Sequence, residues 1–150
     1  MHPVAALDAL PGQPGAYGLA LRLDRGLALS RPGRAAWRLA AGTYLYCGSA
    51  WGPGGLRARV LRHARAPGRL HWHIDRLRHQ AELVAVCAIP RGRECRLAAR
   101  ALALPGVSVP APGFGSSDCR RCAAHLVLLP AGTGVRDIVG GLERVWLWDA

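Results

Sequence analysis

The sequence predicts one domain of the α+β class, with an antiparallel sheet or meander in its first third and helices alternating with strands after it. Every second side chain of residues 17–23 is apolar or aromatic, which is typical of a strand. Residues 56–66 carry an apolar stripe at helical spacing. The 150 residues contain no repeat, low-complexity linker or composition shift, so we expect no domain boundary.

The first third is expected to contain two to four short antiparallel strands. Glycine and proline punctuate this part of the chain, and they set the expected turns. In order, the expected elements are one or two helical turns (4–10), strands at 17–23 and 27–29, a turn at 31–34, and residues 36–39 leading through Gly42 into a strand at 43–47.

A helix rich in arginine follows a Gly/Pro elbow at residues 52–55. The apolar stripe of this helix consists of Leu56, Val60, Leu61 and Ala64. The helix is expected to end at Pro67-Gly68. Arg62 and Arg65 lie opposite that stripe, whereas Arg59 and His63 lie one turn apart at its border. A border residue can touch both the sheet and solvent, so Arg59 and His63 are candidates for a functional site.

The remaining two thirds alternate between helices and strands. Glu82 to Ile89 is a β-branched run and predicts a buried strand. The other expected elements are a helix from about His71 to Gln80, a turn at 90–93, a helix at 94–104, an irregular stretch at 107–118, a strand at 125–129, a short helix at 137–144 and an edge strand at 145–148.

The charge of the chain favours an anionic partner. Twenty arginines, no lysines and nine acidic residues give a net charge of +11, and nucleic acid is the usual partner of such a domain. A GC-rich genome would explain arginine in place of lysine, but not the excess of basic over acidic residues. No apolar run approaches the roughly 20 residues of a membrane span, and the N-terminus lacks signal-peptide features. We therefore expect a cytoplasmic protein without membrane contact, whose oligomeric state the sequence leaves open.

Five cysteines without secretory context make a disulfide framework unexpected. Cys47 and Cys87 lie in apolar strand-like runs and are expected in the core. Cys119, Cys122 and His125 are three soft metal ligands at close spacing, with His71, His73 or Cys95 available as a fourth. Structural zinc requires four ligands, so a zinc site is an alternative to reduced, partly buried thiols.

Several motifs together resemble the GIY-YIG nucleases. Gly15-Ala16-Tyr17 and Tyr46-Cys47-Gly48 match the two tripeptides, and Leu56-Arg57-Ala58-Arg59 with His63 follows on the next helix. The longer motifs resemble one branch of that superfamily, the domain of unknown function 123 or Uri-type group, over about residues 13–130. They are Gly-Thr-Tyr-Leu-Tyr-Cys-Gly-Ser-Ala, Gly-Pro-Gly-Gly-Leu, His-Trp-His-Ile-Asp and Gly-Phe-Gly-Ser-Ser-Asp-Cys.

The resemblance implies a small antiparallel sheet flanked by helices, and phosphodiester cleavage assisted by one divalent metal, Mg²⁺ or Mn²⁺. By position, Tyr17 and Tyr46 would be the paired tyrosines, one of which positions or deprotonates the attacking water. Arg59 would stabilise charge on the phosphate. His63 would take part, with the tyrosines, in removing the proton from the attacking water. Glu94 would hold the metal. The chemistry agrees, because phosphodiester cleavage needs a cation, a base and a metal that polarises oxygen.

The chain departs from the family pattern in three places. Tyr17 and Tyr46 are farther apart than is usual, which implies an extra strand or loop containing Trp37. Glu94 lies at the start of its helix, where the family's ligand is often deeper. The family's later Asn has no counterpart, because the chain contains no Asn. Asp118 is the candidate to replace it, and a possible metal ligand beside Glu94.

Other polar residues keep two interpretations. Arg57 is the rival to Arg59 for the phosphate, and together with Arg62, Arg65, His71 and His73 it is a candidate for nucleic-acid binding. The histidine pair could instead form a hydrogen-bond network at a helix start with Asp75, and Ser116-Ser117-Asp118 could be a helix cap. Tyr44 is expected to be structural.

The sequence thus predicts a metal-dependent DNA endonuclease, possibly specific for a DNA structure or for repair. Two alternatives stay open. One is a nucleic-acid-binding module that kept the fold and lost catalysis, and the other is a zinc-stabilised interaction domain.

Overall fold

Five strands form an antiparallel sheet in the order β6-β4-β1-β5-β7, and two more pair as a separate sheet, β2-β3. The computed structural model describes residues 3–65, 70, 72–115 and 122–150. Within them the strands are β1 (Gly15–Leu23), β2 (Leu27–Arg31), β3 (Arg34–Leu39), β4 (Gly42–Ser49), β5 (Glu82–Pro90), β6 (Leu126–Leu129) and β7 (Trp146–Asp149). The helices are α1 (Pro3–Leu7), α2 (Gly55–Ala64), α3 (His73–Gln80), α4 (Glu94–Leu102) and α5 (Val135–Val139).

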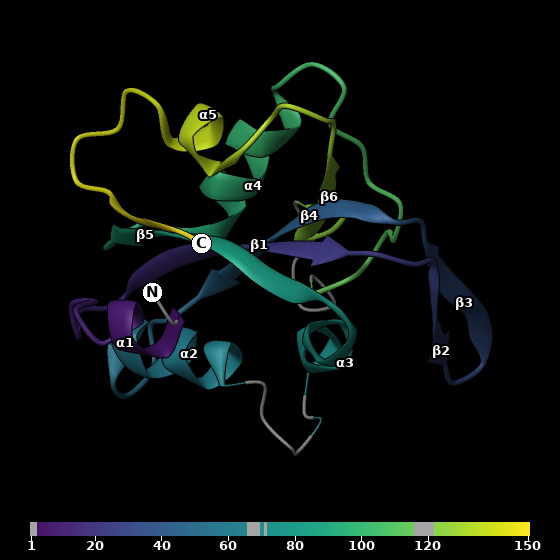
Figure 1. Cartoon of the computed structure of the whole chain (residues 1–150), viewed down its shortest axis with the longest axis horizontal. Helices are drawn as coiled ribbons and strands as arrows, with labels where there is room; N and C mark the ends of the chain where they lie inside the picture. Colours follow the sequence, from purple (N-terminus) through teal and green to yellow (C-terminus); the bar gives the residue numbers. More distant parts are fainter. Residues whose placement is uncertain (1–2, 66–69, 71, 116–121) are drawn as a thin grey trace.

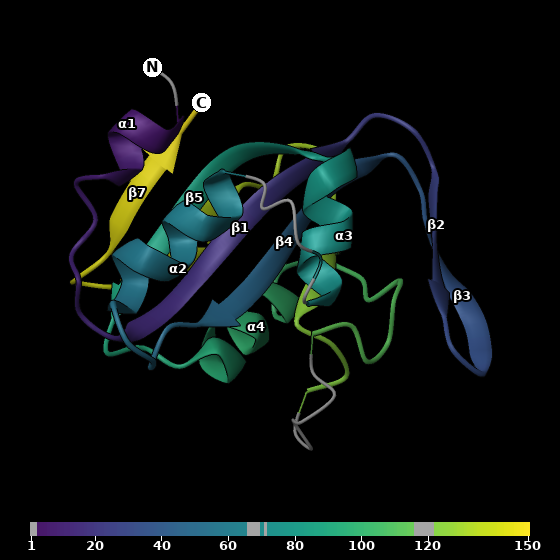
Figure 2. The same ribbon diagram turned by 90° about the horizontal axis from the view of Figure 1, so that it is seen from below.

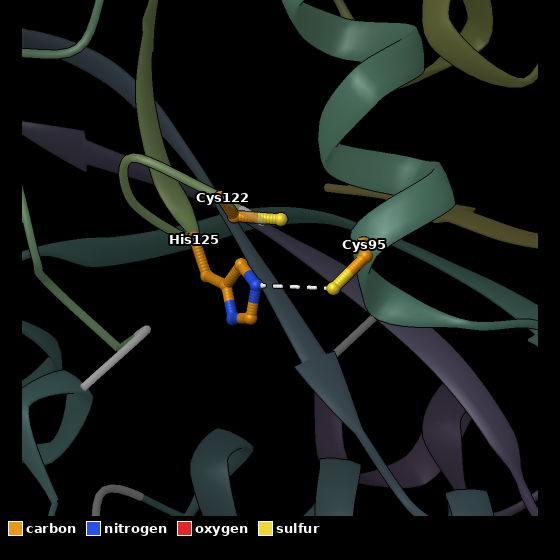
Figure 3. Close-up of side chains that lie close together, drawn as sticks. All are labelled: Cys95, Cys122 and His125. Carbon is orange, nitrogen blue, oxygen red and sulfur yellow. Dashed lines mark hydrogen bonds between the residues drawn. The ribbon is translucent and has the colours of Figure 1, made fainter. Parts of the chain in front are cut away.

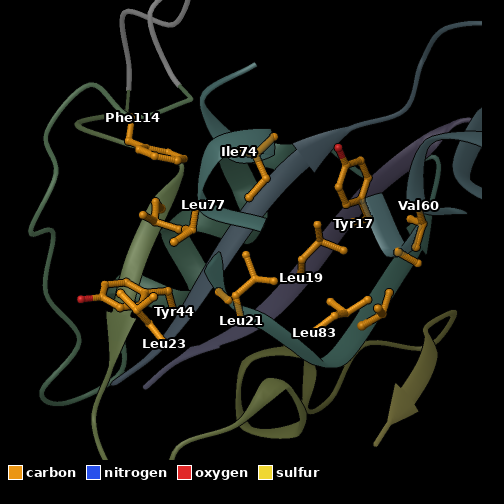
Figure 4. Close-up of a cluster of buried hydrophobic side chains, with 14 of the residues drawn as sticks. Tyr17, Leu19, Leu21, Leu23, Tyr44, Val60, Ile74, Leu77, Leu83 and Phe114 are labelled. Atoms are coloured by element: carbon orange, nitrogen blue, oxygen red, sulfur yellow. The ribbon is translucent and has the colours of Figure 1, made fainter. Parts of the chain in front are cut away.

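Helices cover both faces of the five-stranded sheet (Figure 1). α1, α2 and α3 lie against one face, and α4 and α5 lie against the other. Each face has its own hydrophobic core. The core under α2 and α3 includes Tyr17, Leu19 and Leu21 of β1, whose side chains point toward Val60 and Ile74 of the two helices (Figure 4). The predicted α+β class and antiparallel sheet flanked by helices are confirmed.

β1 is the central strand, and it is buried at every position except Arg22. It pairs antiparallel with β4 on one side and β5 on the other. In these registers Tyr17 lies opposite Gly48, and Leu19 lies opposite Tyr46. A strand that is covered on both faces must be apolar on both, which agrees with the continuous run Gly-Leu-Ala-Leu at 18–21.

The first third contains four antiparallel strands, as expected, but they do not form a meander. β2 and β3 pair only with each other, as a hairpin that extends beyond the main sheet (Figure 2). Both edges of β1 are already occupied by β4 and β5, so β2 has no free edge of β1 to join. The hairpin is the insertion that separates Tyr17 from Tyr46, and its Trp37 donates a 3.1 Å hydrogen bond to the Pro112 carbonyl.

Other element boundaries differ from expectation by a few residues. α5 spans Val135–Val139, earlier than the expected 137–144, because Gly140 has an extended backbone (φ −53°, ψ 132°) and ends the helix. β7 pairs with β5 at the edge of the sheet, as expected. None of the helices among the described residues has the length and apolarity needed to cross a membrane.

Candidate functional site

Two tyrosines and a histidine converge on the sheet face beneath α2. Tyr17 comes from β1, Tyr46 from the neighbouring strand β4, and His63 from the last turn of α2. Tyr17 Oη lies 2.8 Å from His63 Nε2. The Tyr46 ring centroid is 6.3 Å from that of Tyr17 and 6.2 Å from that of His63. Residues separated by up to 46 positions in sequence therefore form one aromatic cluster.

The close approach of Tyr17 to β4 depends on Gly48. Gly48 is the cross-strand partner of Tyr17, and a Cβ at this position would overlap the Tyr17 ring. The hydrogen atom of glycine leaves the space that the phenol occupies. The two short motifs thus form one structural unit, in which Gly48 of β4 leaves room for the ring of Tyr17 of β1.

His63 is completely buried, not at a solvent border as its helical position predicted. Trp72 covers it from the start of α3, with ring centroids 6.1 Å apart. Burial lowers the pKa of His63 to about 4, and the charges of Arg62 and Arg59 oppose its protonation as well. His63 is therefore neutral near pH 7.

The neutral imidazole has a defined orientation. Its Nδ1 makes no hydrogen bond among the described residues and lies 3.9 Å from Oδ1 of the buried Asp75. That contact is not an ion pair, because His63 is uncharged. An Nδ1–H tautomer, inferred from these neighbours, directs its proton toward Asp75 and leaves Nε2 to accept the Tyr17 hydroxyl proton.

Asp75 is a buried carboxylate paired with Arg62. The Arg62 guanidinium donates two hydrogen bonds to the carboxylate, at 2.8 and 3.0 Å, and the backbone N–H of Trp72 donates a third at 2.9 Å. The hydrogen bond to Asp75 is the main reason why the pKa of Arg62 is raised. Arg62 does lie opposite the apolar stripe of α2, but α3 packs there, and the arginine joins the two helices.

Arg59 is half-buried beside the tyrosines. Its Nη1 donates to the carbonyl of Ser49, at the end of β4, at 3.2 Å. Burial raises the pKa of Tyr17 well above its usual value and that of Tyr46 to about 12, and the positive charge of Arg59 acts against burial at both phenols. Arg57 has a different environment, since its Nε donates to the Leu10 carbonyl at 2.7 Å. The cation next to the phenols is Arg59.

Trp72 was not anticipated as a site residue. The guanidinium carbon of Arg59 lies 4.8 Å from the centre of its ring, and that of Arg62 lies 4.3 Å away. The side chain is 36% exposed, so an apolar ring between two cations faces solvent. The available signal was its place in His71-Trp72-His73, within a motif used only for its histidines.

Glu94 begins α4, on the other side of the sheet from α2, and is half-buried. Its negative charge nevertheless affects the pKa of one residue of the tyrosine cluster, Tyr46. Burial is the main cause of the raised pKa of Tyr46, and the negative charge of Glu94 adds to it. The role of Glu94 as a metal ligand stays a prediction.

His73 and His125 are joined through Gly115. The backbone N–H of Gly115 donates to His73 Nδ1 at 3.3 Å, and its carbonyl lies 3.1 Å from His125 Nδ1. A Cβ on Gly115 would lie 2.8 Å from Cε1 of Tyr46. The His73 ring also packs between the rings of Trp37 and Phe114. The half-buried His73 thus holds this segment against Tyr46.

Cys122 and His125 come together with Cys95 of α4 (Figure 3). Their ligand atoms all lie within 4.8 Å of one another, and this is the one such group of three or more potential ligands among the described residues. Cys95 had been named only as an optional fourth ligand. Of the other predicted site residues, Arg65 is exposed and directly follows α2. His71, Asp118 and Cys119 lie outside the described residues.

Comparison with known protein families identifies one relationship. Residues 16–144 match the family described as domain of unknown function DUF123. No curated protein and no solved structure gave a significant match to the chain. The matched region runs from the second residue of β1 past the end of α5 and therefore contains every residue of the tyrosine cluster. Because the match covers most of the chain, this protein belongs to the DUF123 family.

Proposed function

We propose that this domain is a metal-dependent endonuclease of the GIY-YIG type that hydrolyses phosphodiester bonds in DNA. The hydrogen bond between Tyr17 Oη and His63 Nε2 carries the proposal. It connects a phenol to a neutral base, and Arg59 supplies a cation beside them. These are the groups that an activated water and a phosphate require. The resemblance of the two tyrosine motifs to the GIY-YIG pattern points to the same reaction.

The proton route follows from the orientation of the pair. Neutral His63 accepts the Tyr17 hydroxyl proton at Nε2, so a lone pair of the Tyr17 oxygen is left to accept a proton from the attacking water. Water attacks phosphorus, one phosphodiester P–O bond breaks, and the leaving oxygen takes a proton from solvent. Tyr46 is the more exposed of the two phenols and orients the water. Arg59 stabilises the charge that develops on the phosphate oxygens.

Glu94 is the residue we assign to Mg²⁺ or Mn²⁺. One half-buried carboxylate suits Mg²⁺, which keeps several of its waters and takes few protein ligands. The negative charge of Glu94 is a minor contribution to the raised pKa of Tyr46, after burial, which agrees with this assignment. When bound, the ion would polarise a phosphate oxygen.

Nucleic acid is the partner that the surface chemistry favours. The net charge of +11 attracts a polyanion. Trp72 with Arg59 and Arg62, and Trp51 with Arg93 at 4.2 Å, place two exposed aromatic rings under guanidinium groups. Such pairs can contact phosphate through the cation and a base through the ring. Arg57 and Arg65 extend this basic surface along α2.

The test is cleavage by the purified full chain. Supercoiled plasmid, duplex, flap, junction and RNA substrates are incubated with Mg²⁺, Mn²⁺ or a chelator. We expect metal-dependent nicking of DNA, which Arg59→Ala and Glu94→Gln reduce at least 100-fold while DNA binding persists. The matched controls are Arg144→Ala and Glu143→Gln, two exposed residues between α5 and β7, which should cleave like the wild type.

Two results would overturn the proposal. The first is binding of DNA without cleavage of any substrate in either metal, which would instead support a nucleic-acid-binding module. The second is cleavage that persists unchanged in Arg59→Ala and Glu94→Gln, which would assign it to a contaminant or to other residues.

A further inference from the structure

Three potential ligands for a soft metal ion meet where α4 approaches β6. Cys95 lies in the first turn of α4, and Cys122 and His125 precede β6. The thiols point toward each other and toward the imidazole (Figure 3). Cys95 Sγ lies 3.7 Å from His125 Nε2, and the three ligand atoms lie within 4.8 Å of one another.

One of these separations is already close to that of a tetrahedral zinc site. Bond lengths of about 2.3 Å to sulfur and about 2.0 Å to nitrogen place sulfur and nitrogen ligands about 3.5 Å apart, and two sulfurs about 3.8 Å apart. The Cys95–His125 separation of 3.7 Å is close to the first value. A small movement of side chains would therefore complete the geometry.

His125 is already oriented as a metal ligand. Its Nδ1 lies 3.1 Å from the Gly115 carbonyl, which can only accept, so Nδ1 carries the proton. Nε2 is left with its lone pair directed at Cys95. Metal-binding histidines commonly donate their second nitrogen to a backbone carbonyl in this way.

We propose that Cys95, Cys122 and His125 bind one Zn²⁺ ion, separate from the ion assigned to Glu94. Two thiols and an imidazole select zinc over Mg²⁺, which prefers oxygen ligands. Both cysteines lose their protons to solvent on binding. The proposal rests on these three described side chains, and a water molecule can supply the fourth ligand.

The zinc site would fix the start of α4 relative to the tyrosine cluster. Cys95 follows Glu94 directly in the chain. His125 donates to Gly115, where an added Cβ would lie 2.8 Å from Cε1 of Tyr46. The His125 carbonyl accepts a 2.8 Å hydrogen bond from Cys47 N in β4. A metal bonded to both segments therefore anchors Glu94 next to β4. The zinc ion would have a structural role, so its binding can be measured whether or not the protein cleaves DNA.

The experiment measures metal content and metal-dependent stability of the full chain under reducing conditions. We expect one zinc per chain after dialysis, a lower melting temperature after chelation, and recovery with Zn²⁺ but not with Mg²⁺. Co²⁺ loaded in place of zinc should show thiolate-to-metal absorption. Cys95→Ser and His125→Gln should lose stoichiometric zinc, whereas Cys87→Ala, which removes a buried thiol from β5 outside the cluster, should retain it.

The proposal is overturned if wild-type protein saturated with Zn²⁺ keeps none after dialysis, or if Co²⁺ gives no thiolate absorption. Both measurements use the wild type, so they decide the question even if a cysteine variant fails to fold. Zinc binding without DNA cleavage would leave this proposal intact and refute only the nuclease proposal.

Discussion

Tyr17 of β1 and His63 of α2 share a 2.8 Å hydrogen bond and are both almost inaccessible to solvent. The pair joins the central strand to the helix that carries the arginines. It places a neutral imidazole behind a phenol, with Asp75 on the far side of the ring. The same contact has consequences for stability and for chemistry, and both can be measured.

We expect the protein to lose stability as the pH falls from about 6.5 toward 4, partly through His63. Its folded pKa is about 4, whereas an unfolded histidine has a pKa near 6.5, so between these values the unfolded chain binds the additional proton. The stabilisation is complete above pH 6.5 and amounts to roughly 3 kcal/mol at most. Urea unfolding at a series of pH values measures it. His63→Gln should flatten the profile, whereas replacing the exposed His79 with Gln should not; equal profiles for the two variants would refute the assignment.

Gly48→Ala should destabilise the fold strongly. The added methyl would overlap the Tyr17 ring, which is buried and cannot move away without breaking its bond to His63. Overpacking of this kind costs about 1–3 kcal/mol, or more in a rigid sheet. Denaturant unfolding gives the value. Gly12→Ala is the control, since a Cβ there meets nothing within 4 Å, and a similar loss in both variants would contradict the packing argument.

Arg62→Ala should cost about 3 kcal/mol of unfolding free energy, because it leaves the carboxylate of Asp75 buried without its cation. Arg65→Ala, three residues further along the chain at the exposed C-cap of α2, should change stability by no more than about 0.5 kcal/mol. Adding Asp75→Asn to Arg62→Ala should recover part of the loss, since the uncompensated charge is removed. Simple additivity of the two substitutions would show that they do not interact.

Trp72→Ala should weaken DNA binding about 5- to 150-fold, the range for loss of one stacked base at about 1–3 kcal/mol. Trp72→Phe keeps a ring between Arg59 and Arg62 and should recover most of the affinity. Fluorescence anisotropy with labelled single-stranded and duplex DNA at fixed salt measures both. If Trp72→Ala binds DNA with wild-type affinity, the Trp72 ring is not part of the DNA-binding surface.

Local patterns in the sequence determined much of the fold. Alternation in residues 17–23 correctly placed Tyr17, Leu19 and Leu21 on one face of a strand. The Gly/Pro elbow and the apolar stripe correctly placed the arginine helix after β4. These features depend on neighbours within a few residues, so the period of the side chains is sufficient to predict them.

Only the tertiary structure decided how the elements cover one another. The border position of His63 on α2 predicted access to solvent, but Tyr17 and Trp72 cover the ring. The outer position of Arg62 became a contact with Asp75, and Cys95 joined Cys122 and His125 from a distant helix. Periodicity specifies the side of an element on which a residue lies. It contains no information about which other element packs there, because that depends on contacts between residues far apart in the chain.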